Sequence, residues 1–219
     1  MRPSVGWSPN WRPRARPIIT VLDEGRPRVI RDIVRHSQAV VMAYLPGMGG
    51  GRAIADVLFG AVNPSGRLPV SYPRFPNGYT TYDYKAAENL EGNRVEPEFE
   101  FGSGSSYTTF EYSGLKLSGD ALSHAGTLTV SVNVKNSGSR QRKEVVQLYV
   151  SQLCRSISPP NKELKGFRKI DLRAGETSAV TFTLSAADLA FVGLNNTWVT
   201  EPGRFRVKVG QLTKEFTLE

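Results

Sequence analysis

The stretch from Pro46 to Arg74 constrains the fold more than any other part of the chain, because it marks a loop, a helix and a strand in succession. It reads PGMGGGRAIADVLFGAVNPSGRLPVSYPR. Its first part is a glycine-rich loop, and such loops use backbone conformations that residues with side chains rarely adopt. Apolar residues then follow at helical spacing, namely Ile54, Ala55, Val57, Leu58 and Phe59. Gly60 is placed to end that helix, Asn63 to Gly66 predicts a tight turn, and Leu68 to Tyr72 alternates like a short strand.

The residues before this stretch add two strands and a helix. A β-branched run from Ile18 to Leu22 predicts one strand, and the apolar run from Ala39 to Leu45 predicts another that is buried on both faces. Between them, one helical face is formed by Val29, Ile30, Ile33 and Val34. The order strand, helix, strand, helix, strand predicts a mostly parallel βαβαβ sheet with right-handed crossovers. The glycine loop then lies at the carboxyl end of its strand, where such sheets place ligands.

The second half of the chain has the alternation of β-strands. Alternating apolar positions recur at Leu128 to Val134, Val146 to Val150, Val180 to Leu184 and Phe205 to Val209. Clusters of turn residues separate these segments, as in Asn136-Ser137-Gly138 and Glu201-Pro202-Gly203. About seven short strands at this spacing predict an all-β, immunoglobulin-like sandwich.

Four further sequence motifs follow one another along the rest of the chain. They are FEFGSGSSYTTFEYSGL at 99–115, KEVVQLYV at 143–150, KELKGFRKI at 162–170 and EPGRFRVKVG at 201–210. Together with the stretch 46–74, they resemble the C-terminal part of glycoside hydrolase family 3, and its β-glucosidases in particular. The resemblance implies the end of an α/β sandwich domain at 18–74, a linker at 75–104 and a fibronectin type III-like domain at 105–219. Residues 1–17 have no counterpart, and their Pro, Arg and Trp content is typical of a disordered arm.

The resemblance also implies where the chemistry of such an enzyme would lie. Retaining glycosidases use two carboxyl groups, a nucleophile and an acid/base, roughly 5 to 5.5 Å apart. In this family the nucleophile belongs to an N-terminal barrel, and the acid/base typically lies upstream of the position that Pro17 matches. A barrel takes roughly 250 residues, and the whole chain has 219, so we assign no catalytic residue. We expect the chain alone not to hydrolyse glycosides, and a β-glucoside or oligosaccharide to be the substrate of the full-length parent.

The predicted linker is rich in polar and aromatic residues. In the family, the matching stretch runs near the mouth of the active site, and a tyrosine ring suits the C–H face of a sugar. We therefore predict Tyr82 and Lys85 as residues close to substrate. The alternative is that the tyrosines only pin the linker against the two domains. Ser103 and Ser105 stand where the family more usually has an aromatic and an aliphatic residue, and no nearby histidine supports a serine nucleophile.

Charge and composition indicate no further ligand class. The net charge is +8, but the basic excess is diffuse, so we expect no nucleic-acid partner. Cys154 is the only cysteine, and His36 and His124 lack partners at metal-ligand spacing, so we expect no internal disulfide, metal or cofactor. No apolar run approaches the roughly 18 residues of a membrane span, and the N-terminus lacks the apolar core of a signal peptide. These features do not indicate a cellular compartment for the protein.

Three hypotheses follow. The first is a C-terminal fragment of a β-glucosidase-like enzyme, the second a non-catalytic carbohydrate- or partner-binding module, and the third a structural sandwich. The first predicts an unpaired strand edge and uncovered apolar helix faces. The chain should then associate with itself or with a missing barrel segment, and its sandwich half should be the more stable.

Overall fold

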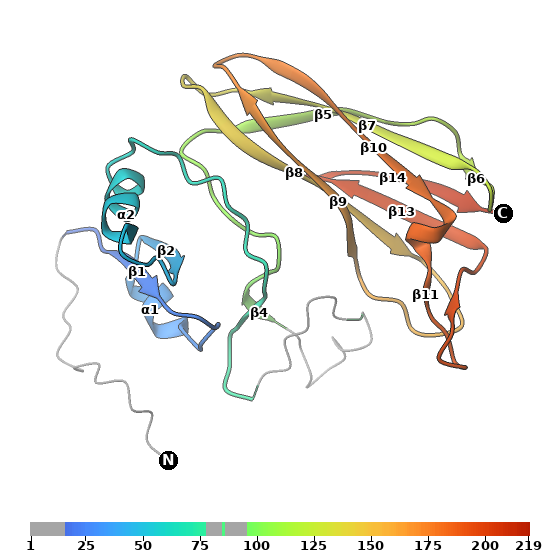
Figure 1. Ribbon diagram of the computed structural model, residues 1–219, viewed down its shortest axis with the longest axis horizontal. Coiled ribbons are helices and arrows are strands. Elements are labelled where there is room, and N and C mark those ends of the chain that lie inside the picture. Colours follow the sequence, from blue (N-terminus) through green and yellow to red (C-terminus); the bar gives the residue numbers. More distant parts are fainter. Residues whose placement is uncertain (1–15, 78–84, 86–95) are drawn as a thin grey trace.

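The computed structural model describes residues 16–77, 85 and 96–219, which form two regions that lie side by side (Figure 1). We call residues 16–77 the α/β region and residues 105–219 the sandwich. The α/β region contains β1 (Ile19–Asp23), α1 (Arg31–His36), β2 (Ala39–Tyr44), α2 (Gly50–Leu58) and β3 (Tyr72–Pro73). Strand β4 (Pro97–Phe99) follows and pairs with β3.

The α/β region begins with the predicted parallel pair. Strands β1 and β2 are parallel, with Ile19 opposite Ala39, and α1 forms the crossover between them. The glycine loop leads from β2 into α2, and Gly50 is required there because a Cβ would lie 2.3 Å from the Cβ of Pro46. Gly60 follows α2 with a φ of +78°, a conformation that favours glycine. The predicted strand, helix, strand, helix order is confirmed up to this point.

The third strand differs from the prediction. Leu68 to Tyr72 does not join β1 and β2; the only strand residues here are Tyr72 and Pro73, and β3 pairs antiparallel with β4. Leu68 instead exchanges backbone hydrogen bonds with Gly102 and Ser103, at 2.7 and 2.9 Å. Pro69 and Pro73 lack the N–H donors of a central strand, which explains why the segment does not continue the parallel sheet.

The predicted turn at Asn63 to Gly66 is also absent. These four residues have no turn assignment, and the Asn63 amide binds the segment at 106–107 rather than its own backbone two residues on. Asn63 favours turns because its side chain can bond locally. Here its Nδ2 donates to the neighbouring Pro64 carbonyl at 2.9 Å and also to the Ser106 hydroxyl, and its Oδ1 accepts from the Tyr107 N–H.

The sandwich consists of two antiparallel sheets packed face to face (Figure 1). The three-stranded sheet has the order β10-β7-β5, and the five-stranded sheet has the order β6-β14-β13-β8-β9, in which only β6 and β14 are parallel. The strands are β5 (Phe110–Leu117), β6 (Ala121–Leu122), β7 (Thr127–Asn136), β8 (Arg142–Gln152), β9 (Glu163–Leu172), β10 (Thr177–Ser185), β13 (Gly203–Val209) and β14 (Leu212–Leu218). A short helix η2 (Ala186–Leu189) and the hairpin β11 (Phe191–Val192) and β12 (Trp198–Val199) join β10 to β13.

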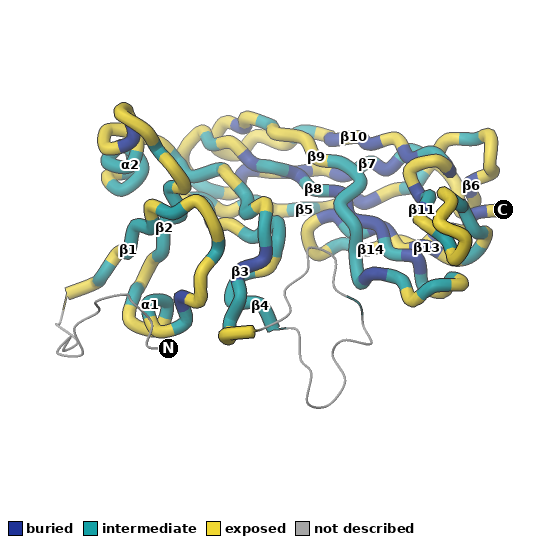
Figure 2. The backbone as a smooth tube through the Cα atoms, turned by 60° about the horizontal axis from the view of Figure 1, so that its bottom comes forward, coloured by how far each residue is buried: buried dark blue, intermediate teal, exposed yellow. Residues whose placement is uncertain are grey.

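The main hydrophobic core lies between these two sheets. Strand β7 alternates buried and more exposed positions along its length, so Leu128, Val130, Val132 and Val134 all point inward. Phe205 on β13 stacks on Phe216 on β14, with ring centroids 5.4 Å apart. Buried positions accordingly gather in the sandwich, whereas the α/β region is mostly exposed or half-buried (Figure 2). The sandwich architecture is the one that the alternating pattern predicted.

The described residues contain neither a helix that could span a membrane nor a cluster of metal-ligating side chains. Within residues 16–77, 85 and 96–219, no helix has the length and apolarity to cross a membrane. The same residues contain no group of three or more His, Cys, Asp or Glu side chains that could hold a metal ion.

Candidate functional site at the junction of the two regions

Lys85 places the linker against the sandwich. It forms an isolated antiparallel bridge with Pro160, in the loop between β8 and β9, and it is half-buried there. Tyr82, the other residue predicted to lie near substrate, falls outside the described residues. The candidate site is therefore built from Lys85, the segment from 96 to 104 and the surfaces that this segment contacts.

One side of the junction is the β3–β4 ribbon. The Tyr72 ring is almost fully buried and meets the Phe99 ring edge to face, with centroids 6.2 Å apart. The Tyr72 hydroxyl donates to Glu24 Oε1 at 3.0 Å. Burial, followed by the hydrogen bond to Glu24 and its negative charge, raises the pKa of Tyr72 well above 10, so this hydroxyl is a structural donor and not a base.

Arginine and glutamate side chains surround the start of the linker. Arg74 Nη1 lies 3.1 Å from Glu96 Oε2, and Arg74 Nε lies 3.7 Å from Glu98 Oε2. The guanidinium of Arg31 lies 4.7 Å from the centroid of the Phe75 ring, a cation–π contact. The Arg74 contacts join the two ends of the linker, and the Arg31 contact joins α1 to its start.

Gly102, the first glycine of the FGSG motif at 101–104, lies close against the sandwich. Gly102 has a φ of +79°, and a Cβ there would lie 2.1 Å from the Tyr149 hydroxyl. Gln147 Nε2 donates to the Gly102 carbonyl at 3.3 Å, and the Tyr149 hydroxyl donates to Gln147 Oε1 at 2.7 Å. Lys162 Nζ lies 2.7 Å from Glu100 Oε2 and so joins the same segment to the sandwich. Only glycine fits at position 102, because any side chain there would clash with Tyr149.

An ion pair with a buried carboxylate links the two regions. Arg67 Nη2 donates to both carboxylate oxygens of Glu144, at 2.6 and 2.8 Å, and Arg67 Nη1 donates to the Gly104 carbonyl. The Glu144 side chain is 5% exposed, and it also accepts a hydrogen bond of 2.8 Å from the Tyr112 hydroxyl. Burial, and then the negative charge of Glu144, raises the pKa of Tyr112 well above 10, so it remains a donor. The pair joins the segment after α2 to the start of β8.

Neither Arg67 nor Glu144 was among the residues predicted from the sequence, and Asn63 was predicted only as part of a turn. A signal for Glu144 was present, because it shares the inward-facing alternation of β8 with Val146 and Leu148. A carboxylate among core positions is rarely buried unless it is paired. No comparable signal identified Arg67, since its partner lies 77 positions away in the sequence.

Two described carboxyl groups have clearly shifted pKa values, and both shifts are downward. Hydrogen bonds from the side chain and backbone of Ser156 lower the pKa of Glu201, and the Arg206 side chain lowers that of Glu215. A glycosidase general acid needs a raised pKa instead. Neither carboxylate has the raised pKa of that role.

Comparison with known proteins places both regions in one family. The model of the "Glycosyl hydrolase family 3 C-terminal domain" matches residues 12–107, and that of the "Fibronectin type III-like domain" matches residues 144–213. The chain belongs to glycoside hydrolase family 3. The family 3 match includes Lys85, Arg67 and Gly102, and the fibronectin type III-like match includes Glu144. The resemblance that the motifs indicated is therefore confirmed.

Relatives and solved structures agree with this assignment. The chain is 41% identical over 207 residues to a lysosomal beta glucosidase of Dictyostelium discoideum, with 89% of this chain and 25% of the relative covered. It is 38% identical to a beta-xylosidase of Formosa agariphila, covering 91% and 28% respectively. A β-glucosidase from Listeria innocua, crystallised with gluconolactone, superposes with a TM-score of 0.84 at 34% identity, over 93% of this chain and 31% of that one. The chain thus spans about a quarter to a third of the length of these relatives.

Proposed function

We propose that this chain is the C-terminal part of a β-glucosidase-type hydrolase, in which it forms one side of the substrate site. The nucleophile and the acid/base come from the N-terminal region of the enzyme. One observation carries the proposal: similarity runs through both regions of the chain, yet covers only 25%, 27% and 31% of three β-glucosidases that it matches. The Listeria innocua enzyme has been crystallised with gluconolactone and, as a mutant, with laminaribiose, which supports a β-glucoside as substrate.

The junction supplies the binding contribution in this proposal. Lys85, held beside Pro160, offers ammonium donors to sugar hydroxyl groups, and Tyr82 offers a ring face and a hydroxyl. The Arg67–Glu144 pair and the Gly102–Tyr149 contact fix the sandwich relative to the α/β region. A fixed sandwich keeps the linker in one position, and fixed binding groups reduce the entropy that substrate binding costs.

A fusion enzyme tests the proposal. The N-terminal region of the Listeria innocua β-glucosidase is joined to this chain at residue 16, and turnover of an aryl β-glucoside is measured for the fusion and for the chain alone. We expect the fusion to be active and the chain alone to be inactive. A folded but inactive fusion would contradict the proposal. So would hydrolysis by the chain alone that a mechanism-based inhibitor abolishes.

Variants of the fusion test the predicted binding residues. Tyr82→Ala and Lys85→Gln should each raise KM about tenfold, which corresponds to the loss of one charged or stacking contact. Lys214→Gln, which removes the same charge from an exposed position on β14, is the control and should leave KM unchanged. If Lys85→Gln behaves like Lys214→Gln, Lys85 is not near substrate.

A further inference from the structure

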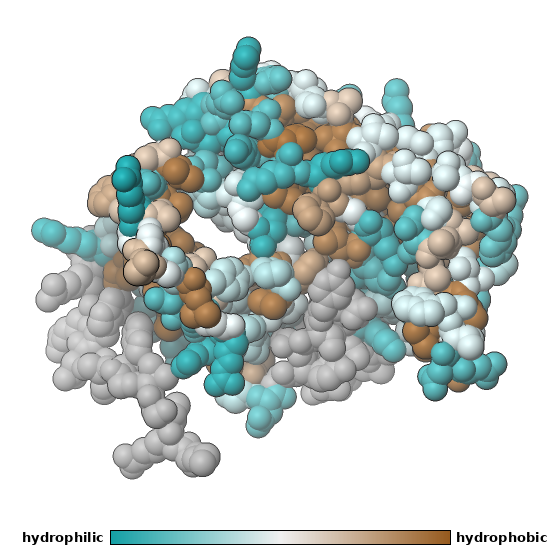
Figure 3. Space-filling model, viewed as in Figure 1, coloured by the Kyte–Doolittle hydropathy of each residue, from teal (hydrophilic) through white to brown (hydrophobic). Residues whose placement is uncertain are grey.

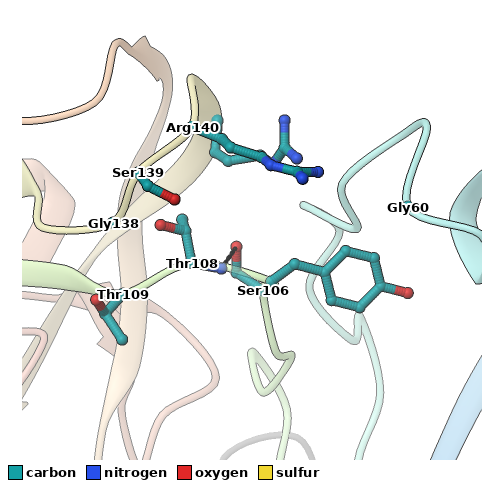
Figure 4. A pocket seen from close by; sticks show the side chains of 9 residues that line it. Gly60, Ser106, Thr108, Thr109, Gly138, Ser139 and Arg140 are labelled. Carbon is teal, nitrogen blue, oxygen red and sulfur yellow. Dashed lines mark hydrogen bonds between the residues drawn. The ribbon is translucent and has the colours of Figure 1, made fainter.

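A polar pocket lies where the end of α2 meets the loop between β7 and β8 (Figure 4). Its volume is about 560 Å³, within the usual range of sites for small molecules. Two arginines line it, Arg140 and Arg142, together with four serine or threonine residues, Tyr107 and two glycines. None of these residues belongs to the linker face described above.

Asn136 fixes the wall that carries the arginines. Its side chain is fully buried, and its Nδ2 donates to the carbonyls of Arg140 and Leu172, at 2.7 and 3.0 Å. Its Oδ1 accepts hydrogen bonds from the Gly138 N–H and the Thr108 hydroxyl, at 3.1 and 3.0 Å. One buried amide therefore holds both the β7–β8 loop and the segment before β5, so this wall is formed before a ligand arrives.

Asn63 fixes the opposite wall. Its Oδ1 accepts a hydrogen bond of 2.9 Å from the Tyr107 N–H, and its Nδ2 donates to the Ser106 hydroxyl at 3.0 Å. The Tyr107 hydroxyl donates to the carbonyl of Val57 in α2 at 2.9 Å. Tyr107 is thus bound to the α/β region through both its backbone N–H and its hydroxyl, although the residue is 54% exposed.

The charges of the pocket point to an anion. No acidic side chain lines it, and neither arginine forms a salt bridge within the described residues. Among the described residues, the Arg142 guanidinium donates to the Gln141 carbonyl alone, at 2.9 Å, and its buried Nε has no hydrogen-bond partner. Figure 4 shows the Arg140 side chain extending from the loop across the pocket from Ser106. Two guanidinium groups with unused donors match the planar oxygens of a carboxylate or the oxygens of a sulfate.

We propose that this pocket binds an acidic saccharide, a sugar that carries a carboxylate or sulfate group. The anionic group contacts Arg140 and Arg142. The sugar hydroxyls bond to the oxygens of Thr108, Thr109 and Ser139, because the Ser106 oxygen already accepts from Asn63 and from the Thr108 N–H. The exposed face of Tyr107 packs on the C–H face of the ring. The pocket has room for a ligand much larger than an inorganic ion. This inference does not rest on the hydrolase function, because it uses none of the residues assigned to that site.

Calorimetry with three probes tests the proposal on the full 219-residue chain. The probes are D-glucuronate, D-glucose and inorganic sulfate. We expect D-glucuronate to bind at least ten times more tightly than either of the others, and to bind more weakly as the salt concentration rises. The proposal is overturned if D-glucuronate does not bind, if D-glucose binds equally well, or if sulfate matches D-glucuronate.

Matched variants assign the binding to the arginines. Arg140→Gln and Arg142→Gln should each weaken D-glucuronate binding roughly tenfold, since a hydrogen bond to a charged group is lost. Arg168→Gln removes the same charge from an exposed position on β9, and we expect it to bind as the wild type does. Circular dichroism checks that each variant is folded. Folded arginine variants that bind D-glucuronate with wild-type affinity would show that the pocket is not the site.

Discussion

The α/β region and the sandwich bury their apolar residues to very different extents. Among the described residues, only Ile30 and Tyr72 are buried hydrophobic residues of the α/β region, whereas all the others belong to the sandwich. Exposed large hydrophobic residues concentrate in the α/β region, where they are Ile19, Val29, Tyr44, Leu45, Met48, Phe59, Val62 and Phe75. Figure 3 shows apolar atoms at the surface around α2.

The difference shows what each region needs in order to be stable. A domain requires two packed layers around one core, and the sandwich supplies both layers itself. The described part of the α/β region has a two-stranded sheet and two short helices, so the apolar face of α2 has little to cover it. We infer that the sandwich folds on its own, and that the α/β region is stabilised by the N-terminal region of the proposed enzyme.

A pair of phenylalanine substitutions gives the largest expected contrast. Phe205 is 2% exposed in the sandwich, and Phe59 is 89% exposed after α2. Phe205→Ala should lower the free energy of unfolding by about 3 to 5 kcal/mol, because it leaves a cavity in the core. Phe59→Ala should change it by less than about 0.5 kcal/mol. Urea unfolding of the two variants measures both values, and equal losses would contradict the comparison.

The second prediction concerns the ion pair between the regions. Arg67→Met leaves the Glu144 carboxylate buried without its cationic partner, which costs about 3 to 5 kcal/mol in fully buried pairs. Because Arg67 is 21% exposed, we expect a smaller loss of about 2 to 3 kcal/mol. Arg206→Met breaks a pair with exposed Glu215 and is the control, with little expected change. Adding Glu144→Leu to Arg67→Met should restore part of the stability, and a failure to do so would argue against an unpaired charge as the cause.

Self-association tests the uncovered surface of the α/β region. We expect the chain to associate through the exposed side chains around α2, so Phe59→Glu should weaken that association about tenfold. Trp198→Glu changes another exposed aromatic residue, 74% exposed on the sandwich hairpin, and should leave the association unchanged. Light scattering during gel filtration measures the mass of each variant over a range of concentrations. A wild-type chain that is monomeric throughout would contradict this prediction.

The smallest expected effect is on the acid stability of the sandwich. Hydrogen bonds from Ser156 lower the pKa of Glu201, so the ionised form is favoured in the folded state. The stabilisation is present above the pKa of the unfolded chain and is lost as the pH falls through the lower, folded pKa. The stability difference between wild type and Glu201→Gln should therefore shrink between pH 5 and pH 3 (about the range where a carboxyl titrates). Urea unfolding across this range checks the sign, and a difference that grows on acidification would refute it.

The sequence predicted best where local pattern and burial agree. Val130, Val132 and Val134 alternate in the sequence and point into the core, so β7 was predictable from periodicity alone. The helix containing Ile54 and Val57 was predictable in the same way, with Gly60 marking its end. The motifs were sufficient to identify the family.

Prediction failed where partners are distant in sequence. Leu68 has a strand-like pattern, but its hydrogen bonds go to residues 102 and 103. Asn63 has a turn-like context, but its amide binds Ser106 and Tyr107 across the junction. The Arg67–Glu144 pair and the pocket at Arg140 likewise join segments that only the fold brings together. Local propensity contains no information about such contacts.

Amide hydrogen exchange tests the central contrast most directly. It is measured on the chain alone and on its fusion to the N-terminal region of a family 3 β-glucosidase. In the chain alone, we expect amides of β7 and β8 to exchange only through global unfolding, and those of β1, β2 and α2 to exchange much faster. In the fusion, both regions should be protected. Equal protection of both regions in the chain alone would contradict this account.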